Sequence, residues 1–286
     1  MPRPLTVACL QTRPQTSFQL ALDEVLLRAE VAVSVGAELL LLPEYCGGLL
    51  TRNGAFVPPA ADEESHPVLI GLQEFAAARQ VWIAIGSVAV SAPEGRVFNR
   101  GFVVDSAGNI RARYDKLHLF DIELKGQQYR ESDHVTPGKS AVVCDTPFGR
   151  IGLSICYDLR FPHLFRELAQ AGAEMLLVPA AFTKKTGEAH WHVLNRARAI
   201  ETSAFVMSAC AVGPVEGGGE SYGHSLIVNP WGEVLVDAGQ FPGVVHTTID
   251  LDEVAATRAQ ISSWNDDITI TVSGSKRPGD KGSAIA

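Results

Sequence analysis

Short apolar runs and helical patterns alternate along the chain, and the same order of elements occurs twice. In the first half, apolar runs predict strands at residues 5–11, 38–42 and 82–90. Apolar residues at helical spacing predict helices at residues 18–35 and 67–79. Two β-rich segments, at 98–104 and 110–114, then flank a turn at 105–109 and indicate a hairpin.

The second half repeats this order. Its predicted elements are strands at 150–155, 174–178 and 204–210, helices at 162–171 and 188–201, and hairpin strands at 224–229 and 233–237. Each half would form a sheet with helices on one face. Because the strands are apolar on both sides, the other face has to be covered as well. Packing the two sheets together meets that need and predicts an α/β fold, a four-layer α-β-β-α sandwich with internal pseudo-duplication.

Two other α/β architectures fit the pattern less well. A Rossmann domain would carry Gly-x-Gly-x-x-Gly after its first strand, and this chain does not. A barrel is disfavoured by the hairpin in each half. We therefore expect a single domain over residues 1–260, followed by an extended or subunit-contacting tail at 261–286.

Composition narrows the range of functions. The chain has 286 residues, 46% of them hydrophobic, and a net charge of −8, which argues against a nucleic-acid surface. It has neither a secretory leader pattern nor an apolar run of membrane length. Its five cysteines are odd in number and form no Cys-x-x-Cys pair. We therefore expect a reduced, cytoplasmic setting, with no nucleic acid and no membrane as partners.

Cys156 is the most informative candidate for chemistry. It follows the predicted strand at 150–155, and Pro162 suits the first turn of a helix. Ligands of open α/β sheets bind beyond the carboxyl ends of strands, and a thiol near a helix N-terminus tends to have a lowered pKa. Most free cysteines are instead small buried hydrophobic residues, and position alone does not decide. We expect Asp158 and Arg160 to form an ion pair behind the thiol.

Two charged residues follow other predicted strands. Glu44 comes after four leucines and Pro43, so burial should raise its pKa and suit it to general-base work. A solvated loop glutamate is the alternative. Lys116 follows the second hairpin strand, where it would stabilise an oxyanion, although most lysines are surface charges.

Around these three residues the chain resembles the nitrilase superfamily of carbon–nitrogen hydrolases. The resemblance rests on Leu-Pro-Glu at 42–44, Tyr-Asp-Lys-Leu-His-Leu-Phe at 114–120 and Ile-Cys-Tyr-Asp-Leu-Arg-Phe-Pro at 155–162. The order and wide spacing of these motifs also match, and the likeness runs from residue 7 to residue 233. Segments at 130–138, 181–191, 196–201 and 222–225 are most similar to the Nit branch of amidases.

The resemblance implies the same sandwich fold and a Glu-Lys-Cys triad. Cys156 would attack an amide carbonyl, Glu44 would transfer protons, and Lys116 and the backbone N–H of Tyr157 would stabilise the oxyanion. Glu131 would hold the charge of Lys116 in place. The implied substrate pocket contains Arg160, Phe182, Thr183, Lys184, His190 and Trp191. No cofactor is required.

We expect no metal site. A metal needs three or more convergent ligands. His190 and His192 are two residues apart at the start of a predicted helix, where their side chains diverge, and His118 is remote in the sequence.

The Nit resemblance implies small ω-amides of dicarboxylic acids as substrates. These are deaminated glutathione, which we favour, and the ω-amide of a short keto acid. Lys184 and Lys185, in a segment expected to be a loop at the pocket mouth, favour an acidic substrate. A nitrilase, an N-carbamoyl acid hydrolase and a non-catalytic binding or assembly module are the alternatives.

The resemblance also implies a homodimer or a larger assembly. Candidates for the contact between subunits are Phe161, Phe165, Leu194 and Ile200. The tail departs from the family pattern, because residues 264–286 are rich in Thr, Ser and Gly and keep only a remote Lys-Arg-Pro echo at 276–278. That departure argues against contacts between subunits through the usual tail sequence.

Overall fold

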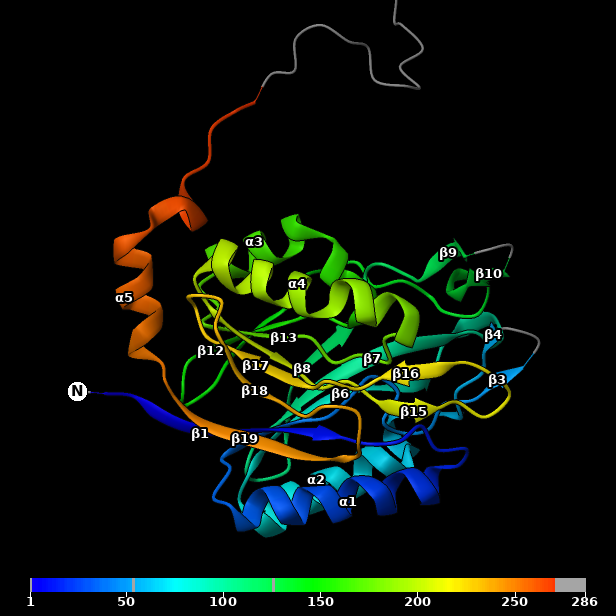
Figure 1. Cartoon of the computed structure of the whole chain (residues 1–286). Coiled ribbons are helices and arrows are strands. Elements are labelled where there is room, and N and C mark those ends of the chain that lie inside the picture. The colour runs from blue at the N-terminus through cyan, green and yellow to red at the C-terminus, as the bar shows by residue number, and fades with distance from the viewer. Residues whose placement is uncertain (1, 53–54, 125–126, 271–286) are drawn as a thin grey trace, which may run out of the picture.

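The computed structural model describes residues 2–52, 55–124 and 127–270. Its centre consists of two large sheets that pack face to face (Figure 1). The first sheet has seven strands in the order β19-β1-β2-β6-β7-β8, with β5 beside β6. These strands are β1 (Pro4–Gln11), β2 (Leu39–Leu41), β5 (Ala60–Ala61), β6 (Trp82–Ser91), β7 (Val97–Val104), β8 (Ile110–Asp115) and β19 (Gly243–Asp250).

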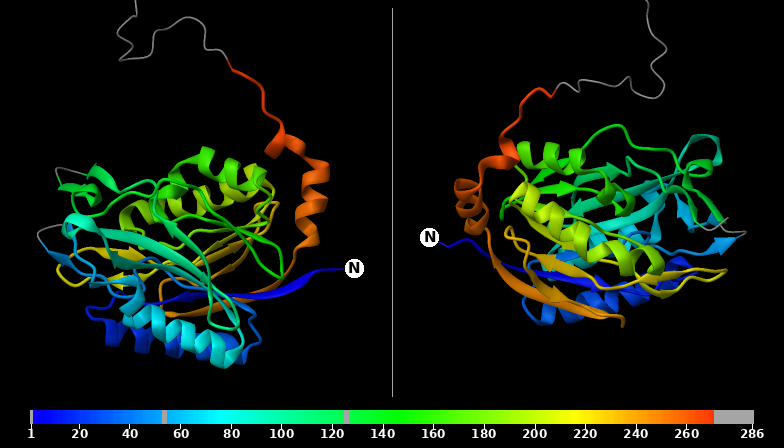
Figure 2. Two further views of the ribbon diagram at one scale, coloured as in Figure 1. Left: turned by 180° about the vertical axis from the view of Figure 1, so that it is seen from behind. Right: turned by 45° about the horizontal axis from the view of Figure 1, so that its top comes forward.

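The second sheet has six strands in the order β11-β12-β13-β14-β17-β18. These are β11 (Val143–Asp145), β12 (Arg150–Leu153), β13 (Met175–Leu177), β14 (Phe205–Ser208), β17 (Leu226–Val228) and β18 (Val234–Asp237). Helices α1 (Phe18–Ser34) and α2 (Pro67–Arg79) lie outside the first sheet, and α3 (Pro162–Gln170) and α4 (Lys184–Thr202) lie outside the second (Figure 2). The predicted four-layer sandwich is therefore confirmed.

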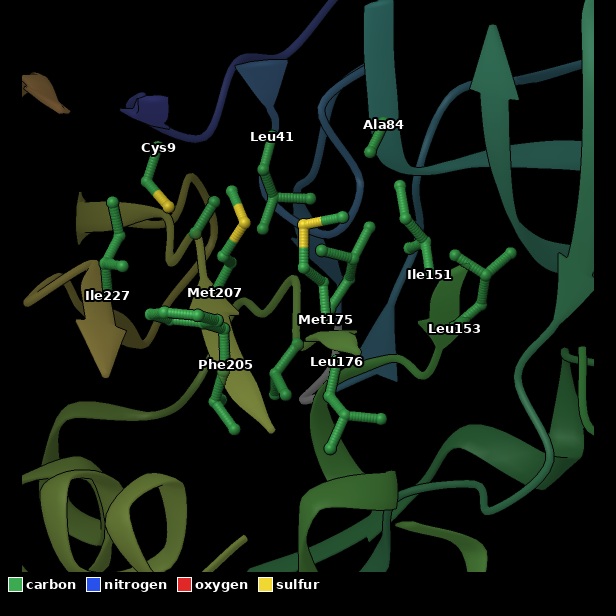
Figure 3. Packing of buried hydrophobic residues seen from close by; sticks show 14 of the residues in the cluster. Cys9, Leu41, Ala84, Ile151, Leu153, Met175, Leu176, Phe205, Met207 and Ile227 are labelled. Carbon is green, nitrogen blue, oxygen red and sulfur yellow. The ribbon is translucent and has the colours of Figure 1, made fainter. Parts of the chain in front are cut away.

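Alternation along the strands assigns side chains to two separate cores. Leu39 and Leu41 belong to the core between the sheets, whereas Leu40 and Leu42 pack with α1 and α2. Figure 3 shows the inter-sheet core, where Leu41 of the first sheet and Met175 of the second belong to the same cluster. A strand that is buried on both faces has to be apolar at every position, which explains the run of four leucines.

The C-terminal elements depart from the predicted duplication. β19 comes from the end of the chain but pairs antiparallel with β1, from Pro4↔Asp250 to Gln11↔Gly243. Helix α5 (Asp252–Gln260) follows it. The hydrophobic pattern predicts neither element, because most of β19 is only partly buried and His246 is exposed.

The start of α4 also differs from the prediction. The helix begins at Lys184 rather than at residue 188, so Lys184 and Lys185 lie in its first turn. The prediction of a loop at these lysines is therefore wrong. The polar sequence Lys-Lys-Thr-Gly gives this first turn no apolar periodicity from which it could be recognised.

Three short strand pairs lie together on one side of the sandwich (Figure 1). They pair β3 (Thr51–Arg52) with β4 (Ala55–Phe56), β9 (Asp121–Leu124) with β10 (Gln127–Arg130), and β15 (Val212–Pro214) with β16 (Glu220–Tyr222). Two short 3-10 helices also contribute to this region, η3 (Glu131–Asp133) and η4 (Cys156–Arg160). Phe56 of β4, Glu131 of η3, and Cys156 and Tyr157 of η4 line the pocket described below.

The described part of the predicted tail packs against α3. Arg166 of α3 donates to the carbonyl of Ser263 at 2.8 Å and to the carboxylate of Asp267 at 2.7 Å. Residues 271–286, which include the Lys-Arg-Pro echo, lie outside the described residues. Across the described ranges, no helix combines the length and the apolar character needed to cross a membrane.

Candidate active site

Glu44, Lys116 and Cys156 line one pocket with an empty volume of about 390 Å³. All three side chains are buried, although the motifs that carry them are far apart in the sequence. The pocket is otherwise lined by Tyr45, Phe56, Phe120, Glu131, Tyr157, Ala181, Phe182, Thr183 and Thr186. The wall is therefore largely aromatic, with the charged groups gathered at one place.

The strand ends explain why these residues meet. Glu44 follows β2 and Lys116 follows β8 in the first sheet, while Cys156 follows β12 in the second. Gly86 allows the two sheets to approach closely, because a Cβ at this position would collide with the carbonyl oxygen of Leu42 and would lie 2.5 Å from Pro179. A larger residue at Gly86 would therefore push apart the strand ends that carry the site residues.

Lys116 is the centre of a buried charge network. Its Nζ donates to Glu44 Oε1 at 2.9 Å and to Glu131 Oε2 at 2.9 Å. Asn99 donates from Nδ2 to the same two carboxylates, at 2.9 Å to Glu44 and 3.1 Å to Glu131. Sequence reasoning missed Asn99, which lies inside β7 and carries no recognisable motif. Its only signal is a polar residue among the mostly apolar residues of β7, where Arg100 is polar as well.

The environment of Glu44 corrects one expectation. Burial alone raises its pKa, but the charge and hydrogen bond of Lys116 outweigh burial, so the pKa of Glu44 is lowered. The backbone N–H of Ala181, from the second half of the chain, also donates to Glu44 Oε2 at 2.8 Å. Glu44 is thus ionised because Lys116 and Ala181 stabilise its carboxylate. Both residues are distant from Glu44 in the sequence, so the prediction from its local sequence did not include them.

Cys156 lies in a strained backbone conformation. Its φ is +50°, in the left-handed region that non-glycine residues rarely adopt, and its N–H donates to the carbonyl of Pro179 at 2.8 Å. Tyr45, next to Glu44, has a φ of +52°. Such strain is often found at functional sites, where surrounding contacts have to maintain it.

The thiol of Cys156 is not pre-ionised, contrary to the expectation of a lowered pKa. Burial first, and then the charge of Glu44, raise the pKa of Cys156 well above its ordinary value. Lys116 opposes this shift but is already neutralised by two carboxylates. The resting pair is therefore a neutral thiol beside a carboxylate.

Asp158 holds the segment of Cys156 in place, but not through the expected ion pair with Arg160. Its carboxylate accepts from the hydroxyl of Tyr114 at 2.7 Å and from the N–H of Ile155 at 2.9 Å, and Oδ1 lies 2.7 Å from Nδ1 of His118. Asp158 therefore connects the cysteine motif to the lysine motif. The ion-pair prediction was wrong because it considered only residues adjacent in sequence.

The chain matches the carbon–nitrogen hydrolase family over residues 6–259. This chain belongs to that family. It is 41% identical over 215 residues to the deaminated glutathione amidase of Yersinia enterocolitica, which covers 73% of each chain. It is 36% identical over 234 residues to the omega-amidase NIT2 of Homo sapiens, covering 80% of this chain and 83% of that protein.

A solved structure shares the fold. The crystal structure of the C. elegans NitFhit protein superposes with a TM-score of 0.82 at 32% identity. The match covers 91% of this chain but only 64% of the NitFhit chain, so this chain spans about two thirds of that protein. Membership of the carbon–nitrogen hydrolase family and the amidase relatives identify this chain as a hydrolase that acts on carbon–nitrogen bonds.

The predicted substrate residues of the carbon–nitrogen hydrolase separate into two groups. Phe182 and Thr183 line the pocket, together with the supporting residues Glu131 and Tyr157. Lys184 instead lines a neighbouring hollow and pairs with Glu220 at 2.9 Å.

The other three predicted pocket residues do not line the pocket. Trp191 is fully buried, where its ring packs beside Phe182 and its Nε1 donates to the carbonyl of His224. Arg160 lies behind the wall, with its guanidinium carbon 5.3 Å from the centre of the Phe182 ring. His190 is exposed and contacts Arg160 at 3.2 Å. These side chains can support the wall but do not face the space where a substrate would lie.

Proposed function

We propose that this enzyme hydrolyses the amide of a small carboxylate-bearing molecule through a thioester on Cys156. The observation that carries the proposal is the convergence of Cys156, Glu44 and Lys116 in one pocket, with Lys116 Nζ 2.9 Å from Glu44. The amidase names of its relatives support the same chemistry.

The first half-reaction forms the thioester. Glu44 removes the proton from the Cys156 thiol as sulfur attacks the amide carbonyl. The resulting oxyanion is stabilised by Nζ of Lys116 and the backbone N–H of Tyr157. Glu44 then gives the proton to the leaving nitrogen, the carbon–nitrogen bond breaks, and ammonia or an amine departs.

The second half-reaction regenerates the enzyme. Glu44 removes a proton from water as the water oxygen attacks the thioester carbonyl. The carbon–sulfur bond breaks, Glu44 returns the proton to sulfur, and the product leaves as a carboxylic acid that loses its remaining proton to solvent. One carboxylate thus serves both halves, which suits a residue held by Lys116, Asn99 and the N–H of Ala181.

The network also suggests when the thiolate forms. Lys116 carries one positive charge between Glu44 and Glu131, so the buried group is already negative before any thiolate appears. A second anion is therefore unfavourable in the resting enzyme, as the raised pKa of Cys156 indicates. We propose that proton transfer accompanies attack on the substrate.

We propose an acidic substrate, with deaminated glutathione favoured over a shorter ω-amide. A second hollow of about 940 Å³ shares Phe56, Ala181 and Thr183 with the pocket and is also lined by Lys184 and Lys185. This space suits the longer tail of deaminated glutathione. Lys184 is paired with Glu220, whereas Lys185 is exposed, so Lys185 is the better candidate for a substrate carboxylate.

A panel of small amides, assayed for release of ammonia or amine, tests the reaction class. For the substrate class, each acidic amide is compared with its methyl ester, in the wild type and in Lys185→Ala. We expect the acid to be preferred in kcat/KM, and Lys185→Ala to reduce that preference more than the matched control Lys184→Ala. Equal kcat/KM for acid and ester in the wild type would contradict the acidic substrate while leaving the amidase proposal intact.

We further propose that the enzyme works in the cytoplasm as a homodimer or larger assembly. Of the contact candidates, Ile200 is 49% exposed on α4, and Val193 on the same helix is 67% exposed. Phe165 is fully buried in the core, so its proposed role as a contact residue is withdrawn. Light scattering on the wild type and Ile200→Asp tests the assembly, and a monomeric wild type at micromolar concentration would contradict it.

A further inference from the structure

A cluster of two histidines and an aspartate lies outside the candidate active site. His192, His224 and Asp237 each present a ligand atom, and the three atoms lie within 4.8 Å of one another. Nε2 of His192 is 3.0 Å from Asp237 Oδ2, and Nδ1 of His224 is 3.1 Å from the same oxygen. The expectation of no metal site considered His192 together with His190 and His118. It did not consider His224 and Asp237, which the fold places beside His192.

The three side chains come from different elements, and neighbouring groups contact two of them. His192 lies on α4, His224 lies between β16 and β17, and Asp237 ends β18. The N–H of His224 donates to the carbonyl of Gly239 at 2.7 Å, and the Gly239 N–H donates to Asp237 Oδ1 at 2.8 Å. The ring of Tyr222 stacks on His224 with centroids 4.5 Å apart. These contacts hold the His224 ring and the Asp237 carboxylate in place beside each other.

We propose that His192, His224 and Asp237 bind one Zn²⁺ ion. Two imidazoles and a carboxylate are ligands that zinc favours, and a tetrahedral site with ordinary zinc bond lengths separates its ligand atoms by about 3.3 Å. The two nitrogen–oxygen separations to Asp237 Oδ2, 3.0 and 3.1 Å, are close to this value. The two histidine nitrogens lie within 4.8 Å of each other, so a shift of the imidazole rings would complete the site. The side chain of Asp237 is 34% exposed, which leaves a position for water as the fourth ligand.

The position of the site gives the ion a structural role beside the pocket. The N–H of Tyr222 donates to the carbonyl of Phe182 at 2.9 Å, and Trp191, next to His192, packs on the Phe182 ring. A bound ion would connect α4, β18 and the segment after β16, which together support that wall. We therefore expect zinc to stabilise the fold without taking part in the reaction.

Zinc binding is best measured by equilibrium dialysis of the full chain, in wild type, His192→Gln and Asp237→Ala. The Cys156→Ala background removes the catalytic thiol as a competing ligand. His190→Ala is the matched control, since His190 is exposed on the same helix but outside the cluster. We expect one Zn²⁺ per chain at low micromolar concentration and a rise in Tm, with both effects kept in His190→Ala.

Affinity should fall at least tenfold in His192→Gln and in Asp237→Ala. Co²⁺ bound to Cys156→Ala with the cluster intact should give the visible spectrum of a tetrahedral complex, which tests the site even if a cluster variant folds poorly. Absence of stoichiometric binding, or binding that both substitutions leave unchanged, would overturn the proposal. Neither result bears on the amidase reaction, because no residue of the cluster lines the catalytic pocket.

Discussion

The two halves of the molecule share an order of elements but contribute different chemistry to the pocket. The first half supplies the charged and polar network of Glu44, Lys116, Glu131 and Asn99. The second half supplies Cys156 and the wall formed by Ala181, Phe182 and Thr183. The charges are therefore organised within one half, whereas the nucleophile reaches them only through packing between the sheets.

This difference separates two requirements of the site. The charge network depends mainly on contacts within the first half, with the N–H of Ala181 as a contact from the second half, and should persist without the thiol. The position of the thiol depends on the strained backbone at Cys156, the hydrogen bond to Pro179 and the close approach at Gly86. Substitutions can therefore remove either the chemistry or the alignment, and the two outcomes are distinguishable.

Cys156→Ala should have the largest effect on activity. Loss of the covalent nucleophile should lower kcat by several orders of magnitude, while the lost packing costs only about 1 kcal/mol or less. Steady-state kinetics and denaturant unfolding measure the two effects. Residual activity within tenfold of the wild type would refute the assignment of the nucleophile.

Glu44→Gln should be nearly inactive, because glutamine keeps the shape of the side chain but cannot transfer protons. Glu131→Gln is the matched comparison within the same network, since Glu131 also accepts from Lys116. We expect the loss of kcat in Glu131→Gln to be clearly smaller. Equal losses would contradict the division between a proton-transferring and a positioning carboxylate.

Gly86→Ala should disturb the alignment between the halves. The added Cβ meets backbone atoms that cannot move aside as a flexible side chain would, so we expect a loss of roughly 1–3 kcal/mol in unfolding free energy and reduced kcat. Gly243→Ala is the control, because its Cβ would have only one neighbour, at 4.0 Å. If Gly86→Ala unfolds and turns over like Gly243→Ala, close approach of the sheets does not limit the site.

His66, in the first half, should have a smaller effect, on the pH dependence of the unfolding free energy. Burial lowers the pKa of His66 to about 4 from 6.5, so the unfolded chain binds a proton that the folded chain does not. Stability should therefore fall as pH decreases from about 6.5 to about 4, by about 2 kcal/mol at pH 5.

The test for His66 is urea unfolding at pH 7 and pH 5 in the wild type and His66→Asn. Asparagine cannot titrate but can still cap α2, where Nδ1 of His66 accepts from the N–H of Leu69. The variant should lose less stability between the two pH values. The same slope in both proteins would exclude His66 as the titrating group.

Much of the fold and the triad could be predicted from the sequence. Apolar strands and helical periodicity were sufficient for the four layers, and the strand-end positions of Glu44, Lys116 and Cys156 indicated where they would meet. β19 was not predicted, because its exposed positions break the apolar pattern. The predicted directions of the pKa shifts of Glu44 and Cys156 were also wrong. The actual shifts depend on charged groups that only folding brings close to these two residues.

Asn99 and Trp191 also show that the sequence alone does not reveal which residues folding brings together. Asn99 bonds both carboxylates but lies within a strand, where the sequence gives no sign of its partners. Conversely, Trp191 belongs to the segment at 181–191 that resembles the Nit branch of amidases, yet its side chain is buried in the core. A motif locates a segment near the site, but only the packing of α4 decides which of its side chains reach the pocket.

Partitioning of the acyl-enzyme by hydroxylamine tests the thioester most directly. Two or more substrates that share an acyl group but carry different leaving amines are hydrolysed with hydroxylamine present, and the ratio of hydroxamate to carboxylate product is measured. A common thioester on Cys156 predicts one ratio for all of them, because the leaving amine has departed before water or hydroxylamine attacks. Ratios that vary with the leaving amine would contradict the account.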